Sequence, residues 1–483
     1  MITALQRKCD VMAEIVSLES ADTGWQATFE HSLAGKFTKA LNEFFSKITK
    51  SKYTSAGNFL QLVSYLAVLV IAVILPLPQF ASDKEGLALV VLAGLGLRIL
   101  GNLLGGKEKY SFTAMDALII GLLAINIVAT FASRYFADSL IGLAKVVVYT
   151  ASYFLFSAVL NKSPKKVILV TAALVFSGLL VSLYGLYQYK IGVAPLATWE
   201  DPTLESKATR IYSTLNNPNL LAGYLIPLLP LSFALTAASF SARRFFLSLF
   251  PLGATAVIFA ALLLTGSRGA IIALGAIVFV LGAILFQWLY VEKPKTRKLL
   301  MAALILLPLI AAAALQLVPG FEQRISSIFA GREHSSNSYR MNVWESSWQM
   351  FLDNWWIGIG PGNKTFRLAY GLYMRSGFDA LGTYCVPLEI AVETGIVGLI
   401  LFVGMVFLSL SRAHLTFWQC QTAYVRWLAA GLAAAIVGVM AHGLVDTVFY
   451  RPQVQLIFWF LLAACVALRK FCQNKNHSLN HTA

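Results

Sequence analysis

The sequence has few charged residues. Only 13% of its 483 residues are Asp, Glu, Lys or Arg, whereas 58% are hydrophobic. This balance excludes an intrinsically disordered chain, because disorder needs low hydrophobicity and much charge. It also excludes an ordinary soluble domain, whose charged share is about 25%. The composition instead places the chain among proteins that cross a membrane several times.

Acidic residues and cysteines are scarce as well. The chain has 23 acidic against 38 basic residues and a formal charge of +15. A nucleic-acid partner is not expected, because the basic residues lie mainly in short segments between apolar runs, where membrane topology explains them. Of the five cysteines, only Cys385 falls on the outer side in the topology below, so we expect no intramolecular disulfide there.

Long apolar runs make up most of the chain. We count about twelve, each long enough to cross a hydrocarbon core of about 30 Å. They cover residues 58–80, 86–104, 113–132, 139–160, 166–188, 218–240, 245–265, 270–290, 299–318, 388–411, 427–446 and 452–468. The sequence therefore predicts an all-α polytopic membrane protein with about twelve transmembrane helices. One large polar loop, residues 319–387, separates the ninth and tenth spans.

The basic residues predict the orientation of these spans. Lys and Arg number 23 in the segments on one side and 4 in the short loops on the other. Because cytoplasmic loops carry the excess of Lys and Arg, both termini are expected on the cytoplasmic side of a bacterial inner membrane. The sequence then divides into a cytoplasmic amphipathic segment (1–57), a membrane domain (58–470) and a cytoplasmic tail (471–483). The segment 1–57 has no signal-peptide pattern.

The loop 319–387 is the main candidate for the functional region. Loops of this length are usually functional or disordered, and this one is rich in Arg and Trp, which argues for order. Arg332 and Arg340 lie in it, while Arg210 and Arg268 lie in other loops on the same side. Since the guanidinium fork binds phosphate oxygens in pairs, several arginines that converge on one side suit a phosphate or diphosphate. A solvated, positively charged loop surface is the alternative.

Two asparagines flank the start of the sixth span. Asn217 and Asn219 stand on either side of Pro218. They either cap the helix or help its amide donors to bind an anionic ligand. Both interpretations remain open.

Several polar residues lie inside or beside apolar spans. His442 and Asp446 are four residues apart and are expected on one helix face, either as a catalytic base with its partner or as a structural pair. Glu393 lies inside a span, where a carboxylate is costly and usually paired or functional. Lys145 is expected to extend to the membrane interface. The turn 358–362 lacks a following Lys-Ser/Thr and is interpreted as a rigid turn, not a nucleotide-binding loop.

Five motifs occur in a characteristic order. They are Asn-Asn-Pro-Asn-Leu-Leu-Ala (216–222), Gly-Ser-Arg-Gly-Ala (266–270), Arg340 followed by Trp344, Gly-Ile-Gly-Pro-Gly-Asn (358–363) and Leu-x4-Glu-x-Gly-x2-Gly (388–398). This series, over about residues 58–470, resembles the O-antigen ligase and polymerase superfamily. The resemblance implies a twelve-span protein that moves a glycan from an undecaprenyl-diphosphate carrier to an acceptor sugar, without metal, nucleotide or other cofactor. It implies that Arg268 and Arg340, with Arg210, hold the diphosphate.

Within that superfamily the chain is similar to the cyanobacterial inorganic-carbon-transport (IctB) branch. The similarity rests on residues 212–219, 386–395 and 442–452. It implies a role in accumulating inorganic carbon, with bicarbonate as the ligand. Glycan transfer and bicarbonate accumulation therefore both remain open. A third alternative is a scaffold that recruits partners through residues 1–57, in which 28–50 forms an amphipathic helix on membrane lipids.

The chain departs from the ligase pattern at one position. The pattern implies His-Asn four residues before Leu388, but the sequence has Tyr384 and Cys385 there. Tyrosine has an ordinary pKa near 10 and is a poor base at neutral pH. If the chain is an enzyme, the resemblance leaves the role of base to His334 or to the pair of His442 and Asp446.

Overall fold

The computed structural model describes residues 2–49, 54–77, 84–105, 110–194, 196, 210–293, 295, 298, 301–302, 306, 326, 328–333 and 335–480. All regular secondary structure in these residues is helical. Eleven of their helices are long and apolar enough to cross a membrane. The prediction of an all-α polytopic membrane protein is confirmed. Most of the predicted ninth span, 299–318, lies outside the described residues.

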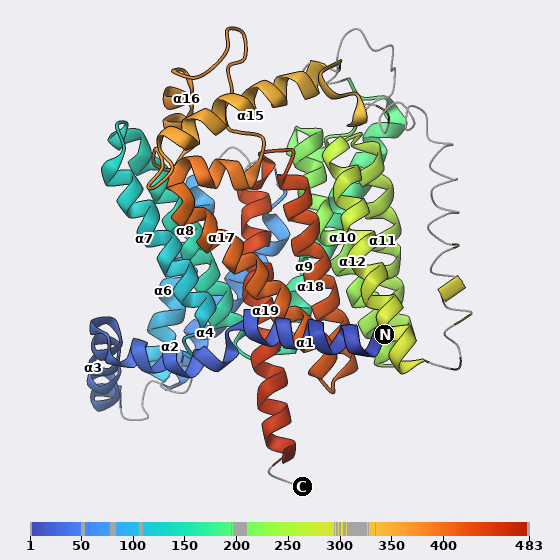
Figure 1. Cartoon of the computed structure of the whole chain (residues 1–483). Helices are drawn as coiled ribbons and strands as arrows, with labels where there is room; N and C mark the ends of the chain where they lie inside the picture. The colour runs from blue at the N-terminus through green and yellow to red at the C-terminus, as the bar shows by residue number, and fades with distance from the viewer. Residues whose placement is uncertain are drawn as a thin grey trace.

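The eleven helices run side by side in one bundle (Figure 1). They are α4 (Thr54–Ile74), α6 (Lys84–Gly105), α7 (Ala114–Ala132), α8 (Phe136–Leu160), α9 (Pro164–Ile191), α10 (Pro218–Ser241), α11 (Phe245–Leu264), α12 (Arg268–Glu292), α17 (Val386–Gln419), α18 (Ala423–Gly443) and α19 (Pro452–Asn480). In the most apolar stretches of α10 and α19, 89% of the residues are buried, against 22% in α12. Helices α10 and α19 therefore form the centre of the bundle, and α12 lies at its edge.

Shorter helices lie at the two ends of the bundle. At one end are α15 (Ser335–Asp353) and α16 (Asn363–Tyr370), with the 3-10 turns η1 (Ser213–Leu215), η2 (Gly331–Glu333) and η3 (Val448–Tyr450). Helix α15 lies across this end, as Figure 1 shows, and we call it the α15 end. The described part of the loop 319–387 is thus largely ordered, as its composition predicted.

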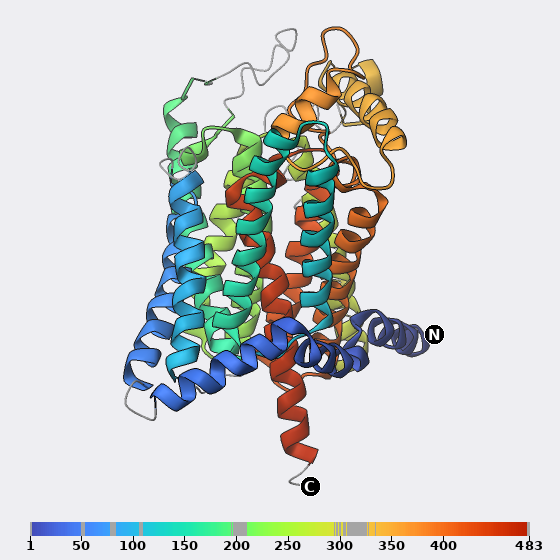
Figure 2. The same cartoon turned by 90° about the vertical axis from the view of Figure 1, so that its left-hand side faces the viewer.

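The N-terminal helices lie at the opposite end, where the C-terminus also emerges (Figure 2). They are α1 (Ile2–Ser17), α2 (Glu19–His31) and α3 (Leu33–Thr49). Asp22 pairs at 3.0 Å with Arg412 of α17, whose side chain is 1% exposed. Glu19 pairs with Arg469 of α19. The polar N-terminal segment is therefore fastened to the bundle by buried charge pairs, which composition alone did not predict.

Helix α17 is broken near its start. Gly395 has φ 67° and ψ −169°, outside the helical region. The interruption is filled by the preceding loop, because Ile396 N donates to Trp355 O at 2.8 Å and Ile359 N donates to Val392 O at 2.9 Å. The sequence predicted one continuous span over 388–411, and this is corrected. Irregular backbone at such a depth persists only where the protein covers it or it borders a cavity.

Candidate functional site

A cavity of about 1270 Å³ opens within the bundle. Its walls come from α7, α8, the start of α10, α16, α17, α19 and the segment 446–451, and we call it the central cavity. Its polar lining residues are Asn126, Lys145, Tyr149, Asn216, Asn217, Asn219, Asn363, Lys364, Tyr384, Glu393, Thr394, Asp446, Thr447, Tyr450, Arg451, Gln453 and Gln455. Phe402, Phe449, Phe458 and Trp459 are its aromatic apolar lining residues. The cavity therefore has both polar and apolar lining.

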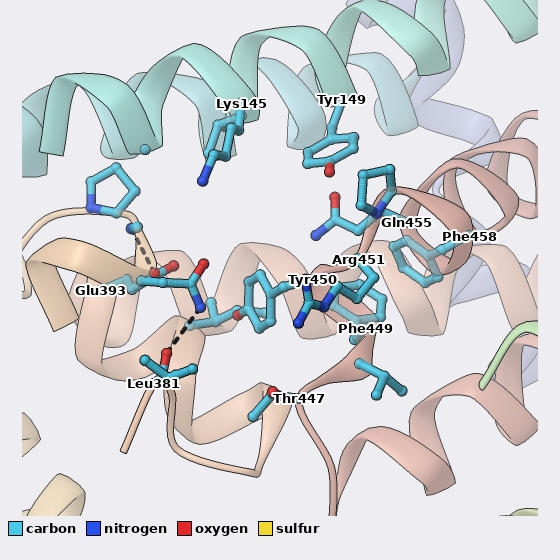
Figure 3. Close-up of a pocket in the computed structure, with 18 of the residues that line it drawn as sticks. Lys145, Tyr149, Leu381, Glu393, Thr447, Phe449, Tyr450, Arg451, Gln455 and Phe458 are labelled. Carbon is cyan, nitrogen blue, oxygen red and sulfur yellow. Dashed lines mark hydrogen bonds between the residues drawn. The ribbon is translucent and has the colours of Figure 1, made fainter. Parts of the chain in front are cut away.

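Lys145 lies well inside the apolar part of α8. It is nine residues beyond Phe136, the first residue of α8, which at 1.5 Å per residue is about 13 Å along the helix axis. Figure 3 shows its side chain pointing from α8 into the cavity, beside Tyr149 one turn further on. The expectation that Lys145 extends to the membrane interface is therefore corrected. A charged side chain inside a span is tolerated where it faces a polar cavity.

Glu393 stands on the wall opposite Lys145, just before the break in α17. Its Oε1 accepts the Gly362 N–H at 2.7 Å. The turn 358–362 brings this donor into place, because Gly360 N also donates to Glu393 O at 3.0 Å. Gly358 has φ 85°, and a Cβ there would lie 2.4 Å from the Glu393 backbone. These hydrogen bonds from the turn hold the carboxylate at the cavity wall.

The three predicted arginines lie at the α15 end, where Asn219 and Asp446 link Arg210 to Arg340 and Arg268 contacts helix α15. Arg210 donates from Nη2 to Asn219 Oδ1 at 3.0 Å, and Asn219 Nδ2 donates to Asp446 Oδ2 at 3.0 Å. The same Asp446 oxygen lies 3.8 Å from Arg340 Nη2. Arg268 donates to Asn337 Oδ1 at 3.2 Å, and Asn337 is three residues before Arg340 on α15. We call these residues the arginine network.

The arginine network lies behind the cavity wall. Asn219 and Asp446 line the cavity, whereas the guanidinium groups of Arg210, Arg268 and Arg340 do not. Asn217 also lines it, and its Oδ1 accepts the N–H groups of Asn219 and Leu220 at 2.8 and 3.1 Å. Asn217 is thus a helix cap, the first of its two predicted roles.

His442 and Asp446 do not form the expected pair. Helix α18 ends at Gly443, so Asp446 is beyond the helix and the four-residue spacing no longer places the two on one face. In the described part of the chain, His442 Nε2 is buried and has no hydrogen-bond partner. The ring packs against Gly269, where a Cβ would lie 2.9 Å from it. His442 does not line the cavity, and His334 lies outside the described residues.

Tyr384 faces both the arginine network and the cavity. Its ring lies 5.9 Å from the Arg340 guanidinium carbon, a cation–π contact, and 5.6 Å from the Tyr339 ring. Burial raises the pKa of the Tyr384 hydroxyl above its ordinary value. The hydroxyl is therefore protonated at neutral pH and cannot accept a proton as a general base.

Sequence reasoning missed two cations of the cavity. The signal that could have found Lys145 is a lysine inside an apolar span, since such charges usually face a polar cavity or a partner. Arg451 precedes Pro452 at the start of α19, and the sequence marks it as a polar residue beside the segment 442–446 without indicating a role. Its side chain lies at the cavity in Figure 3. Within the described residues, no three His, Cys, Asp or Glu side chains come together as metal ligands.

Comparison with known proteins gives one family. No curated protein matches the chain. Residues 253–403, from α11 to the broken helix α17, match the family model described as O-Antigen ligase. This stretch holds Arg268, Arg340, Tyr384 and Glu393. The chain is therefore an integral membrane protein that contains a region similar to O-antigen ligases.

Proposed function

We propose that the protein transfers a glycan from a lipid diphosphate carrier to an acceptor hydroxyl at the α15 end. The observation that carries the proposal is the arginine network, which places three arginines against the wall of the central cavity. A lipid-linked donor has an apolar tail, a diphosphate and a polar glycan. In this proposal the apolar lining of the cavity binds the tail, its polar lining binds the glycan, and the nearby cations bind the diphosphate.

The size of the cavity favours such a donor. Its volume of about 1270 Å³ exceeds the 300–1,000 Å³ of ordinary small-molecule pockets. A monosaccharide and a diphosphate fit within it together. A bicarbonate ion would fill a small fraction of that space and would leave most of the polar lining without a partner.

The charges at the α15 end suit a diphosphate. Arg340 and Asp446 are 3.8 Å apart, at the limit of an ion pair, and the Arg340 side chain is 19% exposed. A diphosphate oxygen can compete for this guanidinium, since charge-assisted bonds to phosphate are shorter and stronger. Lys145 and Arg451 add positive charge on the cavity side. In this proposal the α15 end faces the periplasm and both termini face the cytoplasm, in agreement with the distribution of basic residues.

Bicarbonate accumulation is the second candidate, and the broken helix α17 favours it. Transporters commonly build ion sites from discontinuous helices near the middle of the membrane. Glu393 at the break and Lys145 opposite would then border an ion pathway. Uptake of labelled bicarbonate into proteoliposomes that contain only this protein would support this function. Uptake equal to that of empty liposomes would rule out direct transport.

Arg340→Ala tests glycan transfer. In membranes of a strain that lacks the native gene, we expect the variant to lower transfer from the lipid-linked donor by roughly 100-fold, because removal of one stabilising donor costs about that much. Arg367→Ala is the matched control, since Arg367 is on the same side but 57% exposed and paired with Asp379 at 2.7 Å. Equal transfer by both variants, or unchanged envelope glycans on deletion of the gene, would contradict the proposal.

A further inference from the structure

We propose that the Glu393 carboxylate is the general base that takes the proton from the acceptor hydroxyl. This assignment rests on the proposed glycan transfer, and it fills the role that the sequence left without a residue at Tyr384. The ligand chemistry is a sugar hydroxyl as nucleophile and a glycosyl diphosphate as donor. The reaction centre is then the part of the central cavity between α8 and α17.

Glu393 is the carboxylate with the geometry for this role. Its Oε1 accepts the Gly362 N–H at 2.7 Å, and in this proposal the second oxygen, Oε2, faces the acceptor hydroxyl. The side chain is 8% exposed and lines the cavity. A base needs one free oxygen within reach of the proton and a support that fixes its direction. The turn 358–362 is that support.

Lys145 supplies the balancing charge. It projects from α8 into the cavity opposite Glu393 (Figure 3), and its charge acts on that carboxylate. A carboxylate inside a membrane span is costly unless a cation or polar groups compensate it. Lys145 therefore offsets part of the cost of a charged Glu393 at this depth, and we assign it as a positioning residue.

The other candidate bases are occupied or misplaced. Asp446 accepts the Asn219 amide and the Val448 N–H, and it faces Arg340. Glu389 is one turn before Glu393 but does not line the cavity, and its Oε2 accepts the Thr383 N–H at 3.1 Å. The raised pKa of Tyr384 keeps that hydroxyl protonated. Of the two described acidic residues that line the cavity, Glu393 and Asp446, Glu393 is the one on the wall facing Lys145.

The proposed step is a single displacement. The acceptor oxygen forms a bond to the anomeric carbon of the donor sugar and loses its proton to Glu393 Oε2. The bond between the anomeric carbon and the phosphate oxygen breaks, and its electron pair leaves with the lipid diphosphate. In this proposal, Arg451 at the cavity and the arginine network behind its wall stabilise the charge that develops on this leaving group. The proposed reaction is balanced without an oxidant, a metal ion or a nucleotide.

Glu393→Gln tests the assignment. The amide oxygen of Gln still accepts the Gly362 N–H, so the turn is retained while the basic oxygen is lost. In membrane vesicles with undecaprenyl-diphosphate-linked glycan, we expect transfer to fall by about 10²–10⁴-fold, the usual contribution of a general base. Binding of undecaprenyl diphosphate should stay within about twofold, because the base acts only in the chemical step. The wild-type transfer rate should fall at low pH as Glu393 becomes protonated, and the residual rate of the variant should not show this fall.

Glu389→Gln is the matched control, since it makes the same change one turn away and outside the cavity. It should keep transfer within about threefold of wild type. If Glu393→Gln transfers at more than about a tenth of the wild-type rate, the base is another group and the assignment is wrong. Loss of both binding and transfer in Glu393→Gln would also overturn it, by showing a role in binding or folding. If the wild type neither binds undecaprenyl diphosphate nor transfers glycan, the proposed function itself fails.

Discussion

Tyr384 shows how one residue can change the chemistry of a site. It stands where the ligase pattern implies histidine, its ring lies against Arg340, and the residue lines the cavity. Burial raises the pKa of the hydroxyl above its ordinary value near 10. The group therefore stays neutral below that pH and contributes no charge change between pH 6 and about 10.

Tyr384→Phe is expected to lower glycan transfer by less than about tenfold, because the ring contact with Arg340 is kept and the removed hydroxyl is not a base. The pH profile of the variant should match that of the wild type, since a hydroxyl with a raised pKa does not titrate in the neutral range. Transfer measured from pH 6 to 9 checks both points. A lost inflection in the variant would show that the Tyr384 hydroxyl titrates during turnover.

The sequence identified part of the site at this scale. It pointed to Arg210, Arg268, Arg340 and Asn219, which lie at the α15 end in the structure. These residues could be identified because Arg and Asn beside the ends of apolar spans stand out in the sequence. It gave Lys145 and Arg451 no functional role, since only the packing of α8 against α17 and α19 turns these side chains towards a common cavity.

At the scale of the element, the break in α17 positions the reacting groups. In a continuous helix the backbone groups of residues 392–396 would hydrogen-bond within the helix. They would then not be available to the segment 355–360. With Gly395 at φ 67°, the backbone of residues 392–396 instead bonds the segment 355–360. Glycine is needed because a Cβ at Gly395 would lie 2.2 Å from Trp356 O. The apolar pattern of 388–411 contains no sign of this interruption except the glycine.

Gly395→Ala should therefore destabilise the protein. The strained φ alone costs about 1–3 kcal/mol, and the contact with Trp356 O adds to it. We expect a clear fall in Tm in detergent. We also expect loss of transfer, because the hydrogen bond from the Gly362 N–H to the Glu393 carboxylate would be disrupted. Gly404→Ala is the control on the same helix, where the new Cβ would meet only Leu118 at 3.7 Å. That change should be neutral or stabilising by up to about 1 kcal/mol. A Gly395→Ala protein as stable as the control would mean that the break is not required.

At the scale of the whole molecule, the two ends of the bundle carry different structural elements and different charged groups. The α15 end holds the arginine network and one end of the cavity, and the other end holds the N-terminal helices and the C-terminus (Figure 2). The charge pairs of Arg412 with Asp22 and Arg469 with Glu19 close that second end. The function proposed here needs the α15 end on the outer side, where lipid-linked glycans are joined to their acceptors.

Labelling of cysteines from one side tests that orientation. Cys9 on α1 is exposed, and Lys364 at the α15 end has a side chain 71% exposed. In a Cys385→Ser background, an impermeant maleimide should label Lys364→Cys in intact cells and should reach Cys9 only after the membrane is opened. The physical reason is the excess of Lys and Arg on the Cys9 side. Labelling of Cys9 in intact cells would invert the topology and place the cavity mouth in the cytoplasm.

The sequence by itself determined the helical class and the eleven spans found among the described residues. These properties follow from local hydrophobicity and charge, because each span exchanges water for lipid largely on its own. Only the tertiary structure decided that α17 breaks at Gly395 and that Glu393 faces Lys145 across a cavity. It also decided that Asp446 accepts a hydrogen bond from Asn219 and does not pair with His442. Lys145 and Glu393 are far apart in the sequence, and their proximity depends on how α8 and α17 pack, which no local pattern records.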